Sequence, residues 1–266
     1  MIDKLLRTSK GNIFYRISEK WNPDAETLFF MHGLTADHSM FDMQVSFFEN
    51  ECNVIVWDAP AHGLSRPFKT YSFKNAADCI LKILDTLEVK KVILIGQSLG
   101  GYFAQSFIKY YPGRVKGFIS IDSTPYGKRY YSKADIWLIN QVGWMAYLYP
   151  SDLLKKAIAI QVSTTRRACK NMMQMLEPYE KKELCRLMAL GYSGFLSENC
   201  DLQINCPVLL ISGEKDKTGK VKSYNRDWAK NTGYPLMIIK DAAHNSNVDR
   251  PDEVNKYIRD FLTKLK

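Results

Sequence analysis

The sequence predicts an α/β protein with a mostly parallel, doubly wound sheet and a helical insertion. Short, nearly continuous apolar runs alternate with segments whose apolar residues recur at the helical period. This alternation is typical of parallel strands that helices cover on both faces. Residues 124–200 break the rhythm, because they contain helix-like segments rich in Met and aromatic residues and no clear strand. We therefore expect an insertion over one end of the sheet.

The individual elements follow in chain order. A hairpin is expected first, with strands at 5–7 and 12–17 joined by Ser9-Lys10-Gly11. Six apolar runs are predicted to be buried strands: 27–31, 53–57, 92–95, 117–121, 208–211 and 236–239. Ser72 suits the N-cap of a helix over 73–87, and Pro251 suits the first turn of a C-terminal helix. We expect a core of residues 1–123 and 201–266, with 124–200 as a helical cap.

Composition narrows the class of protein. The net charge of +9 raises the possibility of nucleic-acid binding, but no basic run exceeds two residues, so we expect no nucleic-acid partner. No stretch reaches the roughly 18–20 apolar residues that span a bilayer, so no membrane insertion is expected. The six cysteines show no C-x-x-C pair, and the N-terminus lacks a signal-peptide core. A cytoplasmic protein without a metal or organic cofactor is the simplest interpretation.

A G-x-S-x-G element lies directly between a predicted strand and a predicted helix. It reads Gly96-Gln-Ser-Leu-Gly100, with Ser98 at its centre. A serine on such a tight turn has a strained backbone, and side chains two residues away on either side would collide with neighbouring elements. The turn exposes the hydroxyl at the carboxyl edge of the sheet, where open α/β sheets bind ligands. We therefore predict that Ser98 is a nucleophile.

A serine hydroxyl needs a base and an acid to become reactive. Of the four histidines only His244 follows Ser98, in the loop after the last predicted strand, which makes it the candidate base. Asp216, just past the preceding strand, is the favoured acid. Asp122, at the end of an earlier strand, is its main rival, and Glu214 is a lesser one.

An oxyanion intermediate would also need two N–H donors. We assign them to the backbone amides of Leu99, at the start of the helix, and Leu34, in the loop after strand 27–31. Gly33 precedes Leu34 and lets the backbone approach closely.

With these residues in place, the chain resembles the α/β-hydrolase superfamily, in its capped, single-domain branch of serine hydrolases. His32-Gly33 is similar to the family's oxyanion motif, and Gly96–Gly101 to its nucleophile elbow. Residues 58–65 resemble the D-x-P-G-H-G-x-S turn, with Ala61 in place of a glycine and His62 in a structural role. His244 and the P-x-x-V segment after it complete the match.

The resemblance implies a carboxylesterase-like enzyme that acts on a small-molecule acyl substrate. Candidate substrate-binding residues in the cap are Trp137, Trp144, Arg166 and Arg167, although most aromatic residues of the cap are expected to serve its own core, and an exposed helix face is the favoured role for the arginines. C–C bond hydrolysis or a cofactor-independent elimination on the same triad is one alternative. The other is a non-enzymatic ligand-binding protein of this fold.

Overall fold

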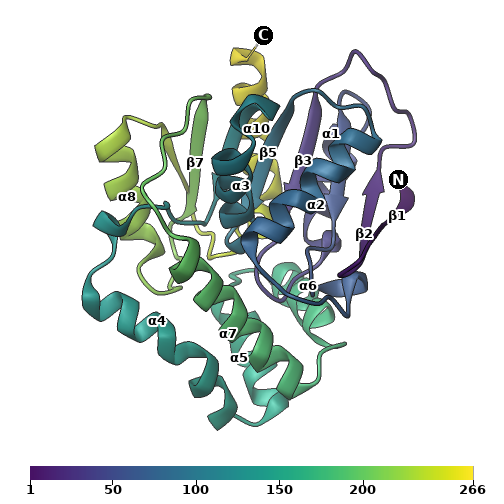
Figure 1. The fold of residues 1–266 in the computed structure, drawn as a ribbon. Coiled ribbons are helices and arrows are strands. Elements are labelled where there is room, and N and C mark those ends of the chain that lie inside the picture. The colour runs from purple at the N-terminus through teal and green to yellow at the C-terminus, as the bar shows by residue number, and fades with distance from the viewer. Residues whose placement is uncertain (266) are drawn as a thin grey trace.

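The computed structural model describes residues 1–265 and contains an eight-stranded sheet (Figure 1). The strand order is β1-β2-β4-β3-β5-β6-β7-β8. The β1–β2 and β2–β4 pairs are antiparallel and all the others are parallel. The strands are β1 (Ile2–Thr8), β2 (Gly11–Ile17), β3 (Thr27–Met31), β4 (Asn53–Trp57), β5 (Val92–Gln97), β6 (Val115–Ile121), β7 (Val208–Gly213) and β8 (Leu236–Ile239). The hairpin, the six strands and the mostly parallel sheet are confirmed, but β8 is only partly buried, because it lies at the edge of the sheet and leaves Ile238 44% exposed.

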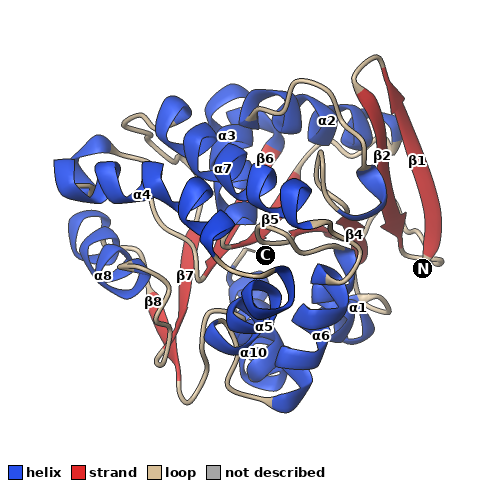
Figure 2. Ribbon diagram, turned by 90° about the horizontal axis from the view of Figure 1, so that it is seen from below, coloured by secondary structure: helices blue, strands red, loops and turns tan. Residues whose placement is uncertain are grey.

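Helices cover both faces of this sheet, as the doubly wound prediction requires (Figure 2). Successive residues of a strand face opposite sides, so Phe29 and Met31 pack in one apolar cluster, and Leu28 and Phe30 in the other. The first cluster includes residues of α2 (Phe73–Thr86), α3 (Leu99–Tyr110) and α8 (Val221–Thr232). The second includes residues of α1 (Asp42–Phe48) and α10 (Pro251–Lys264).

The helix starts follow the predicted signals. Ser72 caps α2 by accepting a hydrogen bond from the backbone N–H of Asn75 at 3.1 Å. Pro251 is the first residue of α10, where its missing N–H removes no helical hydrogen bond.

Between β6 and β7 the chain forms four further helices below the sheet (Figures 1 and 2). They are α4 (Lys133–Met145), α5 (Ser151–Gln161), α6 (Arg166–Leu176) and α7 (Lys181–Glu198). All four fall within the predicted insertion, and they lie over one end of the sheet as expected. Among residues 1–265, none of the helices combines the length and apolar character that crossing a bilayer requires.

The strand order places the site. β3 lies between β4 and β5, so the chain passes from β3 to β4 on one side and later returns to β5 on the other. Such a reversal leaves a crevice at the carboxyl ends of the two central strands. Residues 32–34 follow β3 there, and Ser98 follows β5.

Candidate active site

Ser98 occupies a sharp turn between β5 and α3. Its φ of 50° and ψ of −116° are unusual for a residue other than glycine. The flanking glycines explain how the turn closes. A Cβ on Gly96 would lie 2.4 Å from the backbone of Gly100, and one on Gly100 would lie 1.9 Å from the carbonyl oxygen of Met31. Both positions therefore require glycine, for the steric reason predicted from the sequence.

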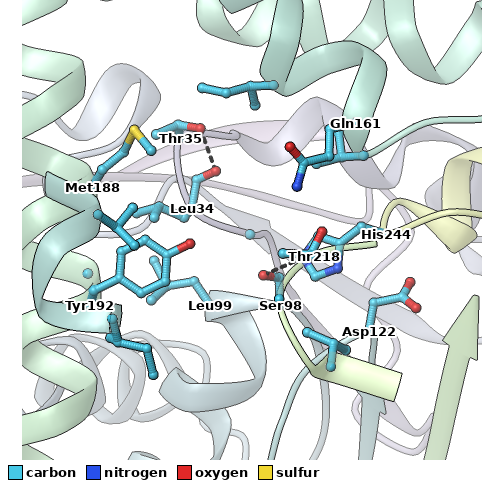
Figure 3. A pocket seen from close by; sticks show the side chains of 18 of the residues that line it. Leu34, Thr35, Ser98, Leu99, Asp122, Gln161, Met188, Tyr192, Thr218 and His244 are labelled. Carbon is cyan, nitrogen blue, oxygen red and sulfur yellow. Dashed lines mark hydrogen bonds between the residues drawn. The ribbon is translucent and has the colours of Figure 1, made fainter. Parts of the chain in front are cut away.

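The structure brings Ser98, His244 and Asp216 into one hydrogen-bonded chain, of which Figure 3 shows Ser98 and His244. The Oγ of Ser98 lies 2.8 Å from Nε2 of His244, and Nδ1 of His244 lies 2.8 Å from Oδ2 of Asp216. A carboxylate at Nδ1 favours the tautomer with its proton there, which leaves Nε2 free to accept the serine proton. The chain has the geometry of a nucleophile, a base and an orienting acid.

Burial and mutual attraction act in opposite directions on the charges of this chain. Burial alone lowers the pKa of His244, but the neighbouring Asp216 carboxylate outweighs it and leaves the pKa raised. Burial likewise opposes ionisation of Asp216, yet the charge and hydrogen bond of His244, together with the amide of Thr218, leave its pKa lowered. Asp216 therefore stays ionised and stabilises a protonated imidazole.

The two rival acids have other partners. Asp122 is fully buried and accepts hydrogen bonds from the amides of Gly213 at 2.6 Å and Ser246 at 3.1 Å. Burial, reinforced by the negative charge of Asp216, raises the pKa of Asp122 to about 7. Glu214 is exposed and accepts from the amide of Asp241. Of the three acids, Asp216 is the one bonded to the imidazole of His244.

The loop after β3 packs closely against the turn that carries Ser98. A Cβ on Gly33 would lie 2.2 Å from Oε1 of Gln97 and 3.3 Å from Cβ of Ser98. Leu34 and Leu99 both line the cavity beside Ser98 (Figure 3). Leu99 is the first residue of α3, where a backbone N–H has no helical acceptor. The assignment of these two amides to an oxyanion hole stays a prediction.

Gln97 is a contributor that the motif did not reveal, because its position in G-x-S-x-G accepts any residue. Its Nε2 donates to the carbonyl oxygen of His244 at 2.7 Å. This bond ties the loop that carries the base to the turn that carries the nucleophile.

The site opens into a cavity of about 610 Å³ between the sheet and the cap. Most of its wall is apolar and comes from the cap. The main apolar lining residues of α4 to α7 are Leu138, Ile139, Val142, Met145, Leu154, Ile158, Met172, Met188 and Phe195. Polar lining residues include Asp122, Thr124, Asp135, Gln161, Thr218, Lys220 and Tyr192. A cavity of this size and character suits a small molecule with an apolar part.

The four cap residues named as substrate-binding candidates from the sequence lie outside the lining of this cavity. The side chains of Trp137 and Trp144 are 65% and 54% exposed, because α4 turns its Leu138–Ile139–Val142 side toward the cavity. Arg166 is exposed at the start of α6, and Arg167 donates to the carbonyl oxygen of Val248. None of the four is among the described residues that line the cavity.

The turn at residues 58–65 is held by hydrogen bonds. The carboxylate of Asp58 accepts from the amides of His38 and Leu64 and from Nδ1 of His38. The potential metal-ligand atoms of Asp37, His38 and Asp58 lie within 4.8 Å of one another. However, N–H donors already occupy both carboxylate oxygens of Asp58. Ala61 has a φ of 65°, so it takes a left-handed conformation at the position where the D-x-P-G-H-G-x-S turn has a glycine. His62 is buried, and burial lowers its pKa to about 3.

The mostly parallel sheet, with Ser98, His244 and Asp216 hydrogen-bonded at its carboxyl edge, has the arrangement that the resemblance to the α/β-hydrolase superfamily predicts. The family model of the alpha/beta hydrolase fold matches residues 26–251, so the chain belongs to this family. It is 24% identical to an uncharacterized hydrolase, YugF, of Bacillus subtilis, with 94% of each chain covered.

Solved structures share the fold at full length. A thermophilic esterase from Thermogutta terrifontis superposes with a TM-score of 0.77 at 20% identity, covering 100% of this chain and 99% of the other. An enol-lactonase from Burkholderia xenovorans gives 0.80 at 21% identity, covering 98% and 100%.

Proposed function

We propose that the protein is a serine hydrolase that cleaves carboxylic esters through an acyl-enzyme. The observation that carries this proposal is the chain of two 2.8 Å hydrogen bonds from Ser98 through His244 to Asp216, at the wall of a largely apolar cavity. A neutral imidazole held by an ionised carboxylate beside a strained serine turn is the arrangement that activates a hydroxyl for attack on a carbonyl.

The reaction proceeds in two steps. The Ser98 oxygen bonds to the carbonyl carbon while Nε2 of His244 takes the hydroxyl proton, and the amides of Leu34 and Leu99 donate to the oxyanion. The C–O bond to the leaving alcohol then breaks, and His244 returns the proton to that oxygen. Water, deprotonated by His244, attacks the acyl-enzyme and releases the acid and Ser98. These steps use side chains and backbone amides of the chain alone.

The alternatives are less well supported. An elimination or C–C cleavage guided by cap arginines would need Arg166 or Arg167 at the cavity, and neither is among the described residues that line it. A pure binding protein would have no use for a serine held in a strained turn against a paired imidazole. Lactone opening is ester hydrolysis on a cyclic substrate, so lactones belong in the same substrate series, as the enol-lactonase among the structural neighbours suggests.

Covalent labelling by a fluorophosphonate probe, read by intact mass, tests the proposal. Wild type is expected to gain one adduct and Ser98→Ala none. Hydrolysis of p-nitrophenyl esters of increasing acyl length then measures turnover. A folded wild type that neither labels nor hydrolyses any of these esters would refute the proposal.

A further inference from the structure

The cavity lining is nearly devoid of free positive charge. Among its described residues, Lys220 is the single lysine or arginine. It lies in the loop between β7 and α8, shortly after Asp216. Two carboxyl groups, Asp122 and Asp135, also line the cavity. Whether an anionic group can enter therefore depends on whether Lys220 is available to bind it.

Lys220 already has a partner from the cap. Its Nζ lies 2.7 Å from Oδ1 of Asp135, near the start of α4. The other oxygen of Asp135 accepts from the backbone N–H and the hydroxyl of Ser132, at 2.9 and 2.7 Å. The hydrogen bond with Lys220 is the main reason that the pKa of Asp135 lies well below its usual range. The pair is therefore ionised and neutral as a whole.

The pair also connects the core to the cap, the two parts of the chain that line the cavity. It joins the first turn of α4 to the core loop before α8, next to each other in Figure 1. Toward the other end of α4 the lining changes to apolar side chains, including Met145, Leu154 and Ile158. Figure 3 shows Leu34, Leu99, Met188 and Tyr192 on one side of Ser98, and Gln161, Thr218 and Asp122 on the other.

We infer that the substrate portion enclosed by this cavity is uncharged, and that its acyl chain occupies the apolar end. This inference rests on the proposed function and adds the substrate class. A carboxylate placed among the apolar residues would lose its hydration without gaining a partner, which is costly. At the polar end it would meet the negative charge of Asp135, which already offsets the charge of Lys220. Asp135 is thus the residue that excludes anions.

Two esters of matched length test the inference. They are p-nitrophenyl hexanoate and the mono-p-nitrophenyl ester of adipic acid, which carries a carboxylate at the end of the same six-carbon chain. Wild type is expected to favour the hexanoate by at least about tenfold in kcat/KM, since an unpaired charge must be desolvated. Equal rates, or a preference for the adipate ester, would overturn the inference.

The variant Asp135→Asn is expected to gain activity on the anionic ester. It keeps an oxygen for the Ser132 bonds but frees the charge of Lys220, so the adipate-to-hexanoate ratio of kcat/KM should rise about tenfold. Asp152→Asn is the matched control, because Asp152 is an exposed acid in the first turn of α5 and lies outside the lining. Its ratio should equal that of wild type. An unchanged ratio in folded Asp135→Asn would contradict the role of the pair.

A binding measurement separates this inference from the proposed function. Calorimetry on Ser98→Ala compares 2-octanone with 7-oxooctanoate, a ketone of equal length that ends in a carboxylate, so no turnover is required. Tighter binding of 2-octanone supports the inference even if no ester is hydrolysed. Equal binding, tighter binding of the carboxylate, or binding of neither overturns it, even if esters are hydrolysed.

Discussion

The core and the cap both line the cavity, but the chain constrains them very differently. At the core edge, the backbone leaves no room for change: a Cβ at Gly100 would approach the Met31 carbonyl oxygen to 1.9 Å. In the cap, α7 contains Gly194, whose Cβ would meet ring atoms of Phe73 no closer than 3.6 Å. The cap also leaves Trp137 and Leu148 largely exposed. Close backbone packing therefore fixes Gly100, whereas Gly194 in the cap has only ordinary side-chain contacts.

The largest expected effect concerns the two buried acids of the core. Asp216→Asn should lower kcat for p-nitrophenyl hexanoate by about 10⁴-fold, because the amide favours the wrong imidazole tautomer. Asp122→Asn keeps the bond between Asp216 and His244 and should cost less than about 10²-fold. Steady-state kinetics on both purified variants measures the difference. The reverse order would assign the acid role to Asp122.

The next prediction compares the effect on the free energy of unfolding of replacing a glycine in the core with that of replacing a glycine in the cap. Gly100→Ala should lower the free energy of unfolding by about 3 kcal/mol or more, because the new methyl group meets backbone that cannot move aside. Gly194→Ala lies in a helix with ordinary contacts and should change it by no more than about 1 kcal/mol, in the stabilising direction. Urea denaturation followed by circular dichroism measures both. Similar losses would contradict the contrast between core and cap.

A smaller effect concerns the dependence of stability on pH. Burial and the charge of Asp216 raise the pKa of Asp122 from 3.8 to about 7, so the folded chain keeps this proton when the unfolded chain has lost it. The stabilisation is complete below about pH 4 and is lost as the pH rises through about 7.

Asp122→Asn cannot titrate, so its Tm should lie furthest below that of wild type at pH 5 and closer to it at pH 8. Thermal unfolding of both proteins across this range measures the gap. A constant gap would mean that the Asp122 carboxyl does not change ionisation between these pH values.

The smallest effect distinguishes the two sides of α4. Trp137→Ala should leave kcat/KM for p-nitrophenyl hexanoate within about threefold, because its side chain points away from the cavity. Val142→Ala removes lining from the cavity and should lower the same quantity by up to about tenfold. Kinetics at equal protein concentration compares them. A larger loss from Trp137→Ala would place that residue in the substrate path.

The strand pattern and the glycine turn could be predicted because they depend on local sequence. Apolar runs such as 27–31 and 53–57 are buried on both faces, so every position after the first is apolar. The need for glycine at positions 96 and 100 could be predicted because a side chain at either position would collide with backbone at or beside the strand-to-helix turn. His244 was identified by elimination among four histidines, and the favoured acid by its place after a strand.

The sequence by itself thus determined the fold class, the nucleophile turn and the order of the reactive residues, because strand burial and backbone sterics act over short stretches of chain. Tertiary structure alone decided which acid bonds to His244, since Asp122 and Asp216 both follow strands that end at the same edge. It also decided which side of α4 faces the cavity and that Lys220 pairs with Asp135. Those outcomes depend on how elements distant in sequence pack, and no local pattern records that packing.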